Sequence, residues 1–189
     1  MKSLIQSFID LTIFGAVIKT QELAKIICEA IIETKALNIS IIDVHEQPSC
    51  GEYLILCNGM ATRQVRAVAE NVLHKIKSQC DLLPLGVEGR GLDQWVVVDY
   101  GFIIIHIFQP EMREYYDLDG LWLNSPRIPL SDLGIEYEEQ EPSEESLEEY
   151  SEDDFSDEGS FDYGSDEELA AYAAEYAENS DFEDSESDS

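Results

Sequence analysis

The sequence predicts an α/β (α+β) domain in which a mixed sheet of about five strands is flanked by helices. Apolar residues recur at helical spacing in segments 20–35 and 62–79. Short runs rich in β-branched or aromatic residues lie between and after them, which gives the order α-β-β-α-β-β-β-α. This order differs from the strict βαβ alternation of a doubly wound nucleotide-binding fold. From Gly134 onward the composition becomes acidic, which is typical of a disordered tail.

An N-terminal extension, residues 1–19, is expected to precede the first half of the domain. Thr20 is expected to cap the helix 20–35, because threonine hydroxyls accept bonds from the first helical amides. The β-branched run 39–44 and the apolar run 53–57 predict two strands. Segment 62–79 then predicts a long helix with an apolar stripe and a basic outer face.

The second half carries three further strands and a short helix. Segment 84–87 predicts a short strand, followed by a glycine-rich turn over 86–91. The runs 95–98 and 102–108 are almost continuously apolar, so both are expected inside the sheet and covered on both faces. Pro110 can open a helix over 110–116. Three apolar residues close the domain: Leu118, Leu121 and Trp122.

Charge separates the two predicted regions, 20–133 and the tail 134–189. The chain has 11 Lys+Arg and 41 Asp+Glu, a net charge of −30, of which residues 134–189 carry −24. Nucleic-acid binding through phosphate neutralisation needs clustered basic residues, so DNA is excluded as a partner. A basic protein, or the basic surface of a larger assembly, fits this charge.

The cysteines and the apolar segments indicate a cytoplasmic protein. The cysteines show no C-x-x-C spacing, so we expect reduced, packed thiols without disulfides or metal. They are Cys28, Cys50, Cys57 and Cys80. Polar residues interrupt the apolar stretch 4–18, so no signal peptide is expected. No later run reaches the ~18 apolar residues that cross a bilayer, so no membrane contact is expected.

No set of residues predicts catalysis, a metal or a cofactor. The turn 86–91 lacks the Lys-Ser/Thr of a phosphate-binding loop and is expected to be a flexible turn. His106 lies in an apolar run, which favours a hydrogen-bonded core histidine over a catalytic base. The acid pairs Glu111/Glu114 and Asp117/Asp119 are expected to form a solvated helix face.

A surface rich in aromatic and acidic groups is the remaining candidate site. Aromatic side chains often anchor protein interfaces, and acids favour a basic partner. The candidates are Glu88, Trp95, Asp99, Tyr100, Glu111, Tyr115, Tyr116 and Trp122. The alternative is that Trp95 and Trp122 fill the core, which is favoured for Trp122.

Six segments in order resemble the ribosomal silencing factors, also called Iojap-like proteins. They are 53–59 (YLILCNG), 63–65 (RQV), 84–89 (PLGVEG), 95–101 (WVVVDYG), 106–108 (HIF) and 111–122 (EMREYYDLDGLW). The resemblance runs from about Gln21 to Trp122 and leaves out the extension and the tail. It implies a pared-down nucleotidyltransferase-like fold.

The resemblance also implies a function. Such proteins bind the large ribosomal subunit through its fourteenth protein, block joining of the small subunit and lower translation when nutrients are short. Unbound, they are expected to form a homodimer. Carried onto this sequence, the partner-binding residues are Glu88, Trp95, Asp99, Tyr100, His106 and Tyr116. Steric exclusion requires no chemistry, so this reading predicts a translational repressor that is not an enzyme.

Two positions depart from the family pattern. Ala61 stands where serine is usual, which removes a helix cap that Thr62 or Asn58 is expected to replace. Phe102 stands where aspartate is usual after Tyr-Gly, and is expected to alter the contact with the partner.

The alternative function is a nucleotidyl-transferring enzyme on the same fold. Such enzymes need carboxylates that converge on Mg²⁺ beside a phosphate-binding turn. Before the tail, Asp117-Leu118-Asp119 is the only Asp-x-Asp, and it lies near a helix end. Site chemistry outweighs fold analogy, which favours the non-enzymatic reading.

The tail lies outside the resemblance. A capping box at Ser165–Glu168 precedes apolar residues at helical spacing, which predicts a short helix near 166–178. We expect the tail to compete for basic patches, either on ribosomal proteins or on the basic face of the long helix. That face comprises Arg63, Arg66, Lys75 and Lys77. The alternative is a solvated tail without a role in binding.

Overall fold

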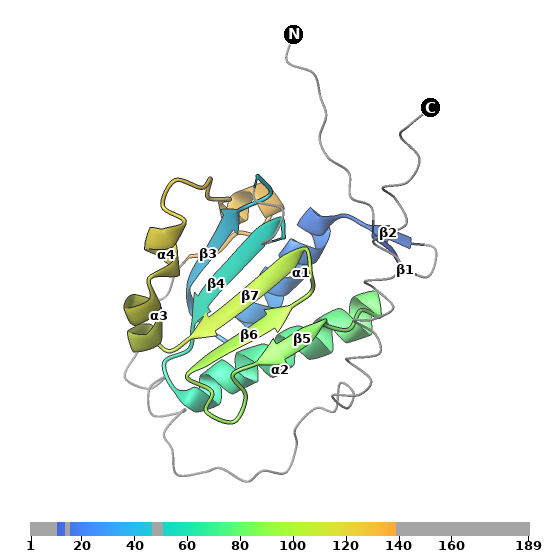
Figure 1. Cartoon of the computed structure of the whole chain (residues 1–189). Coiled ribbons are helices and arrows are strands. Elements are labelled where there is room, and N and C mark those ends of the chain that lie inside the picture. The colour runs from blue at the N-terminus through green and yellow to red at the C-terminus, as the bar shows by residue number, and fades with distance from the viewer. Residues whose placement is uncertain (1–10, 14–15, 47–50, 139–189) are drawn as a thin grey trace, which may run out of the picture.

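A computed structural model describes residues 11–13, 16–46 and 51–138 of the 189-residue chain. The predicted fold class is confirmed: one mixed sheet has five strands in the order β3-β4-β7-β6-β5, with helices packed on it (Figure 1). Only β4 and β7 pair in parallel, and the other neighbours in this sheet are antiparallel. The helices and strands, in chain order, are β1 (Leu11–Ile13), β2 (Ala16–Ile18), α1 (Thr20–Glu33), β3 (Leu37–Asp43), β4 (Tyr53–Asn58), α2 (Thr62–Cys80), β5 (Gly86–Glu88), β6 (Trp95–Asp99), β7 (Ile103–Phe108), α3 (Pro110–Tyr116), α4 (Leu118–Leu121) and the 3₁₀ helix η2 (Leu130–Leu133).

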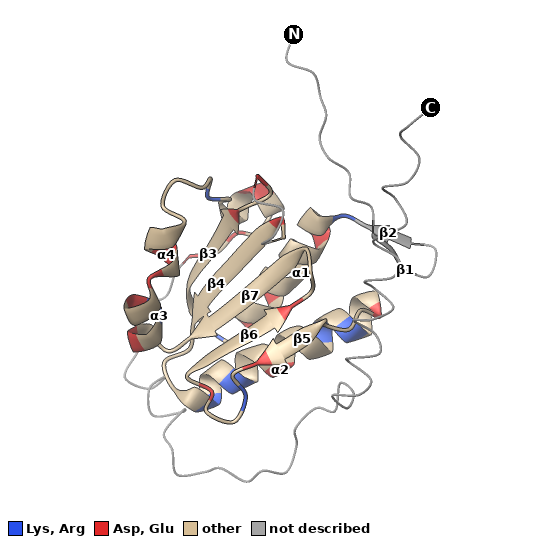
Figure 2. Cartoon of the chain, in the orientation of Figure 1, with Lys and Arg blue, Asp and Glu red and all other residues tan. Residues whose placement is uncertain are grey.

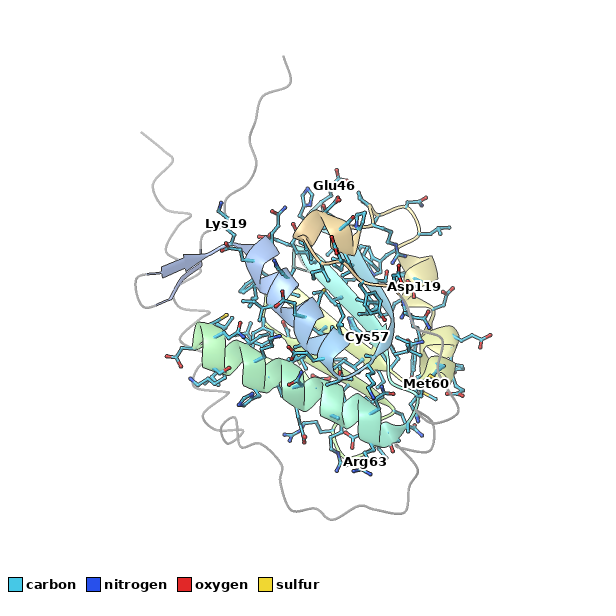
Figure 3. The ribbon with its side chains drawn as sticks, turned by 180° about the vertical axis from the view of Figure 1, so that it is seen from behind. Lys19, Glu46, Cys57, Met60, Arg63 and Asp119 are labelled. Carbon is cyan, nitrogen blue, oxygen red and sulfur yellow. The ribbon has the colours of Figure 1, made fainter. Side chains whose placement is uncertain are left out.

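Helices α1 and α2 cover one face of the sheet, as the view from behind shows (Figure 3). Their apolar stripes include Leu23 and Ile27 on α1 and Val65 and Val72 on α2, all at most 1% exposed. These side chains pack on strand residues such as Ile55 and form the main core. Apolar burial on this scale is the dominant favourable term in folding.

The opposite face of the sheet is covered only in part. A smaller core there joins residues of β3, β4 and β7 to Met112 of α3 and to Leu118 and Trp122 of the α4 region. Along β6, Val96 and Val98 are buried, but their neighbours are half-buried. The expected interior positions of β6 and β7 are confirmed, whereas the expectation that both strands are covered on both faces is wrong, because each has half-buried residues on this face.

The predicted side-chain caps are absent from both long helices. Thr20 is the first residue of α1, and the N-cap is Lys19. The N-cap of α2 is Ala61, which makes no side-chain cap bond, and neither Thr62 nor Asn58 replaces the missing serine.

Gln64 takes over the role of a cap at the start of α2. Its Oε1 accepts a hydrogen bond from the Met60 amide at 2.7 Å. Its Nε2 donates to the carbonyls of Thr34 and Lys35, both at 3.1 Å. A side chain that is 3% exposed thus ties the start of α2 to the end of α1.

The described residues extend past the predicted tail boundary at Gly134. Ile135 is buried in the main core, and the Tyr137 hydroxyl donates to the carbonyl of Ala36 at 3.4 Å. Residues 135–137 therefore pack with the domain. The predicted helix near 166–178 lies outside the described residues.

The cysteines in the described part of the chain are free thiols, as expected. Cys28, Cys57 and Cys80 are all buried, whereas Cys50 lies outside the described residues. Burial raises the pKa of Cys28 and of Cys57 to about 12. None of the helices described in the structure is both long and apolar enough to span a bilayer.

Candidate functional site

Strand alternation brings four predicted site residues onto one face of the sheet. Trp95 and Asp99 lie two positions on either side of Val97 in β6, so all three point to the same face. Val97 is the cross-strand partner of Glu88 in β5 and of His106 in β7. We call this surface the open face: Glu88, Trp95, Val97, Asp99, Ile104 and His106.

Trp95 is the centre of an aromatic cluster on the open face. Its ring stacks on Phe108, with centroids 5.0 Å apart and planes 20° apart. Tyr116 of α3 lies against it at 4.6 Å, and the His106 ring lies at 5.9 Å. Because its neighbours fix the ring while leaving it half-buried, Trp95 is a preorganised aromatic surface.

His106 is held neutral within this cluster. Its Nδ1 accepts a hydrogen bond from the indole Nε1 of Trp95 at 3.3 Å. Burial lowers the pKa of His106 from 6.5 to about 4. The ring therefore carries no charge at neutral pH, and the prediction of a hydrogen-bonded histidine is confirmed.

Two carboxylates lie beside the aromatic cluster. Asp99 is half-buried, and its Oδ1 accepts from the Gly101 amide at 2.6 Å, which fixes the turn between β6 and β7. Glu88 is exposed on the edge strand β5. These acids give the open face the charge that suits a basic partner.

Tyr100 does not belong to this surface, which corrects the prediction. Its side chain is 2% exposed and packs in the main core on the helix-covered side. Residues 99 and 100 are neighbours in an extended segment, so their side chains point to opposite faces. Phe102 is buried in the same core, so it cannot make the partner contact directly.

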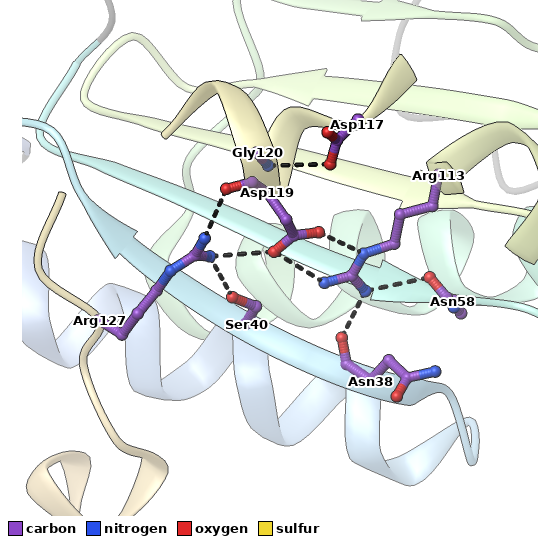
Figure 4. Close-up of polar contacts among 8 residues, drawn as sticks. All are labelled: Asn38, Ser40, Asn58, Arg113, Asp117, Asp119, Gly120 and Arg127. Carbon is purple, nitrogen blue, oxygen red and sulfur yellow. Dashed lines mark hydrogen bonds and ion pairs between the residues drawn. The ribbon is translucent and has the colours of Figure 1, made fainter. Parts of the chain in front are cut away.

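A polar network anchors α3, the helix that carries Tyr116 (Figure 4). Arg113 donates to Asp119 Oδ2 at 2.8 Å and to Asn58 Oδ1 at 3.0 Å. It also donates to the carbonyl of Asn38 at 2.5 Å, and Arg127 donates to Asp119 Oδ1 at 3.0 Å. Tyr116 follows Arg113 by almost one helical turn, so these bonds fix the position of the tyrosine against Trp95.

Only part of the acid pair Asp117/Asp119 forms the predicted solvated face, because Asp117 is exposed whereas Asp119 is half-buried. Asp117 Oδ1 accepts from the Gly120 amide at 2.9 Å and caps α4. Burial by itself raises the pKa of Asp119, but hydrogen bonds and charge from Arg113 and Arg127 outweigh it and hold that pKa below its ordinary value. Among the residues that the structure describes, no group of three or more His, Cys, Asp or Glu side chains could hold a metal ion.

The comparisons with known proteins decide the family. Residues 17–157 match the family model described as "Ribosomal silencing factor during starvation". The chain belongs to the ribosomal silencing factor family. This family consists of ribosome-associated regulators of translation and is not a known family of enzymes.

Individual silencing factors agree with this assignment. The chain is 33% identical over 100 residues to the ribosomal silencing factor of Zymomonas mobilis, which covers 53% of this chain and 74% of that protein. The chain is 32% identical over 118 residues to the ribosomal silencing factor of Bacillus subtilis, and this match covers 61% of this chain and 96% of that protein. A crystal structure of a Chromobacterium violaceum protein superimposes with a TM-score of 0.54 at 28% identity, covering 69% of this chain and 99% of that one.

The structure adds two residues that sequence reasoning missed. Val97 and Ile104 lie on the open face and are half-buried. The period of two in β6 could have placed Val97 beside Trp95 and Asp99. Ile104 required the register of β7, in which it pairs with Asp99.

Proposed function

We propose that this silencing factor binds the large ribosomal subunit through its fourteenth protein and thereby blocks joining of the small subunit. The repression lowers translation under nutrient limitation. One observation carries the proposal: a member of this family presents an ordered tryptophan on a sheet face that helices cover only in part.

The aromatic cluster supports an anchoring role for Trp95. Hot spots of protein interfaces are enriched in tryptophan and tyrosine held in well-packed surroundings. Trp95 and Tyr116 meet this description, since their rings lie 4.6 Å apart and Tyr116 remains 48% exposed. Because these rings are already held in place, binding immobilises few further side chains, and the entropic cost of binding is lower.

The charge of the open face supports a basic protein as the direct contact. Glu88 and Asp99 flank the apolar centre, while four of the ten Lys and Arg among the described residues lie on α2 (Figure 2). Three of the four basic residues predicted to form a patch on α2 already pair with acids: Arg66 with Asp93, Lys75 with Glu33 and Lys77 with Asp81. The open face therefore suits contact with cationic groups of a ribosomal protein better than contact with rRNA phosphates.

The mechanism that we propose is steric exclusion. A specific interface buries about 800 Å² on each partner, and a domain docked on the joining face masks a larger area than it contacts. No covalent step is involved. The contact residues proposed here are Glu88, Trp95, Asp99, His106 and Tyr116, with Tyr100 acting only from the core.

Co-sedimentation with purified large subunits tests the binding claim. The wild-type protein should pellet with them, and Trp95→Ala should bind about 10–30-fold more weakly, as expected for loss of an aromatic anchor. Gln79→Ala on α2 is the matched surface control and should bind normally, because that helix lies behind the sheet. A wild-type protein that stays in the supernatant would refute the proposal.

A further inference from the structure

The loop between β5 and β6, residues 89–94, has an unusual backbone. Gly89, Gly91 and Asp93 have φ values of +85°, +91° and +50°. A side chain at Gly89 would collide with the Trp95 carbonyl, since a Cβ there would lie 1.9 Å from that oxygen. Left-handed conformations cost free energy for residues other than glycine and persist only where surrounding contacts hold them. Asp93 therefore needs a compensating interaction.

Arg66 of α2 supplies that interaction. Its Nε donates to Asp93 Oδ2 at 2.8 Å, and its Nη2 contacts the same oxygen. The other oxygen, Oδ1, accepts from the Gly91 amide at 3.3 Å, and the Asp93 amide donates to the Gly89 carbonyl at 3.2 Å. The Asp93 side chain is only 3% exposed. The ion pair thus ties the loop to α2, and the first three residues of the predicted turn 86–91 form the strand β5.

Leu92 points outward from the same loop. It is 77% exposed, whereas the adjacent Asp93 is 2% exposed. The Gln94 carbonyl accepts from the Gln109 amide at 2.8 Å, which ties the end of the loop to the segment between β7 and α3. Leu92 is therefore a large apolar side chain on a fixed backbone, three residues before Trp95.

Single exposed leucines are common on protein surfaces, so exposure alone does not indicate a contact site. The relevant observation is an exposed leucine on a backbone that is held in place. Here a buried ion pair and the hydrogen bonds of the loop hold the backbone of a leucine that is exposed three residues before Trp95. Such preorganisation lowers the cost of ordering a loop on binding. Strain held by surrounding structure is typical of functional segments.

We propose that Leu92 is a second apolar contact with the same basic ribosomal protein, and that Arg66 is its positioning residue, acting through Asp93. This inference rests on the proposed function, because it assigns Leu92 to the partner that Trp95 binds. In this proposal the Leu92 side chain enters an apolar recess of that ribosomal protein, next to the place where the Trp95 ring binds.

Affinity for purified large subunits tests the contact. Leu92→Ala should weaken binding about 5–10-fold, as for a typical apolar interface residue. Leu123→Ala is the matched control, because Leu123 is 75% exposed but follows α4, and it should bind like wild type. Equal binding of Leu92→Ala and wild type would overturn the proposal, as would equal losses in both variants.

A double-mutant cycle tests the positioning role. Arg66→Lys keeps the charge but loses the two-nitrogen contact, and it should speed hydrogen exchange at the Gly91 and Asp93 amides while weakening binding. If Arg66 acts through Leu92, adding Leu92→Ala to Arg66→Lys should cost little further affinity. Fully additive losses, or unchanged exchange at both amides, would remove Arg66 from the proposal.

The outcomes separate this inference from the proposed function. If wild type fails to bind large subunits, both are refuted. If wild type binds and Trp95→Ala weakens binding while Leu92→Ala does not, the proposed function stands and the Leu92 contact is refuted.

Discussion

Trp95 donates a hydrogen bond from its indole Nε1 to Nδ1 of His106, 3.3 Å away on the neighbouring strand. The bond requires His106 Nδ1 to be unprotonated, which agrees with the lowering of its pKa to about 4 by burial. The hydrogen bond also fixes the edge of the tryptophan ring, while the stacking of that ring on Phe108 fixes the orientation of the ring plane. The orientation of the proposed anchor thus depends on a neutral histidine.

Stability should decrease as the pH falls from 6.5 to 4. In this range the unfolded chain takes up a proton on His106, whose ordinary pKa is 6.5, whereas the folded protein does not until about pH 4. The unfolded state then binds more protons, so the free energy of unfolding should fall by about 2–3 kcal/mol. Urea unfolding at several pH values measures this change.

His106→Gln serves as the control for the pH dependence. Glutamine retains an acceptor for the Trp95 indole but does not titrate, so this part of the pH dependence should be absent from the variant. If wild type and His106→Gln show the same dependence between pH 6.5 and 4, His106 is not its source.

Arg113→Ala should destabilise the protein by about 2–4 kcal/mol, because it leaves buried polar partners without their donor. Arg113 is 13% exposed, and Asn58, which it bonds, is 5% exposed. The midpoint of urea unfolding should fall at constant slope. Arg63→Ala, at an exposed position of α2, is the matched control and should change stability by less than about 0.5 kcal/mol. A loss as small as that of the control would show that the network in Figure 4 contributes little.

Asp99→Asn should remove a negative charge from the open face without changing the structure of that face. Asparagine keeps the oxygen that accepts from the Gly101 amide, so stability should be unchanged. Loss of the negative charge should weaken binding to large subunits about 3–10-fold at low salt, and the difference should shrink as salt screens the charge. Salt-dependent binding curves of the two proteins measure this. Identical curves would exclude a charge contribution from Asp99.

Truncation after Glu138 tests the acidic tail. This position keeps Ile135 and Tyr137, which pack on the domain, and removes 22 acidic residues with no basic ones. If the tail competes for basic patches, the shortened protein should bind large subunits more tightly at low salt. The difference should vanish near 1 M salt, where the Debye length is about 3 Å. Equal affinities at low salt would favour the solvated tail without a role in binding.

Much of the fold follows from local patterns in the sequence. The apolar stripes of α1 and α2 predicted both helices to within two residues at each end, because amphipathic periodicity over several turns is a strong signal. The short elements were harder. The β1–β2 pair, α4 and η2 were not predicted, since three or four residues carry too little periodicity.

The candidate site was predictable in its residue types and not in its geometry. Aromatic character and the family resemblance assign Tyr100 to the surface, whereas alternation turns its side chain into the core. The Arg66–Asp93 pair joins residues 27 positions apart, and the Arg113 network spans up to 75. Such pairings depend on the packing of α2 and α3 on the sheet, which no local pattern specifies.

Light scattering of subunit re-association tests the central claim most directly. Purified small and large subunits are mixed in Mg²⁺-containing buffer with increasing amounts of the wild-type protein, of Trp95→Ala or of Gln79→Ala. The wild type and Gln79→Ala should suppress association at saturation, while Trp95→Ala should need about 10–30-fold more protein for the same effect. Undiminished association at saturating wild-type protein would contradict the account.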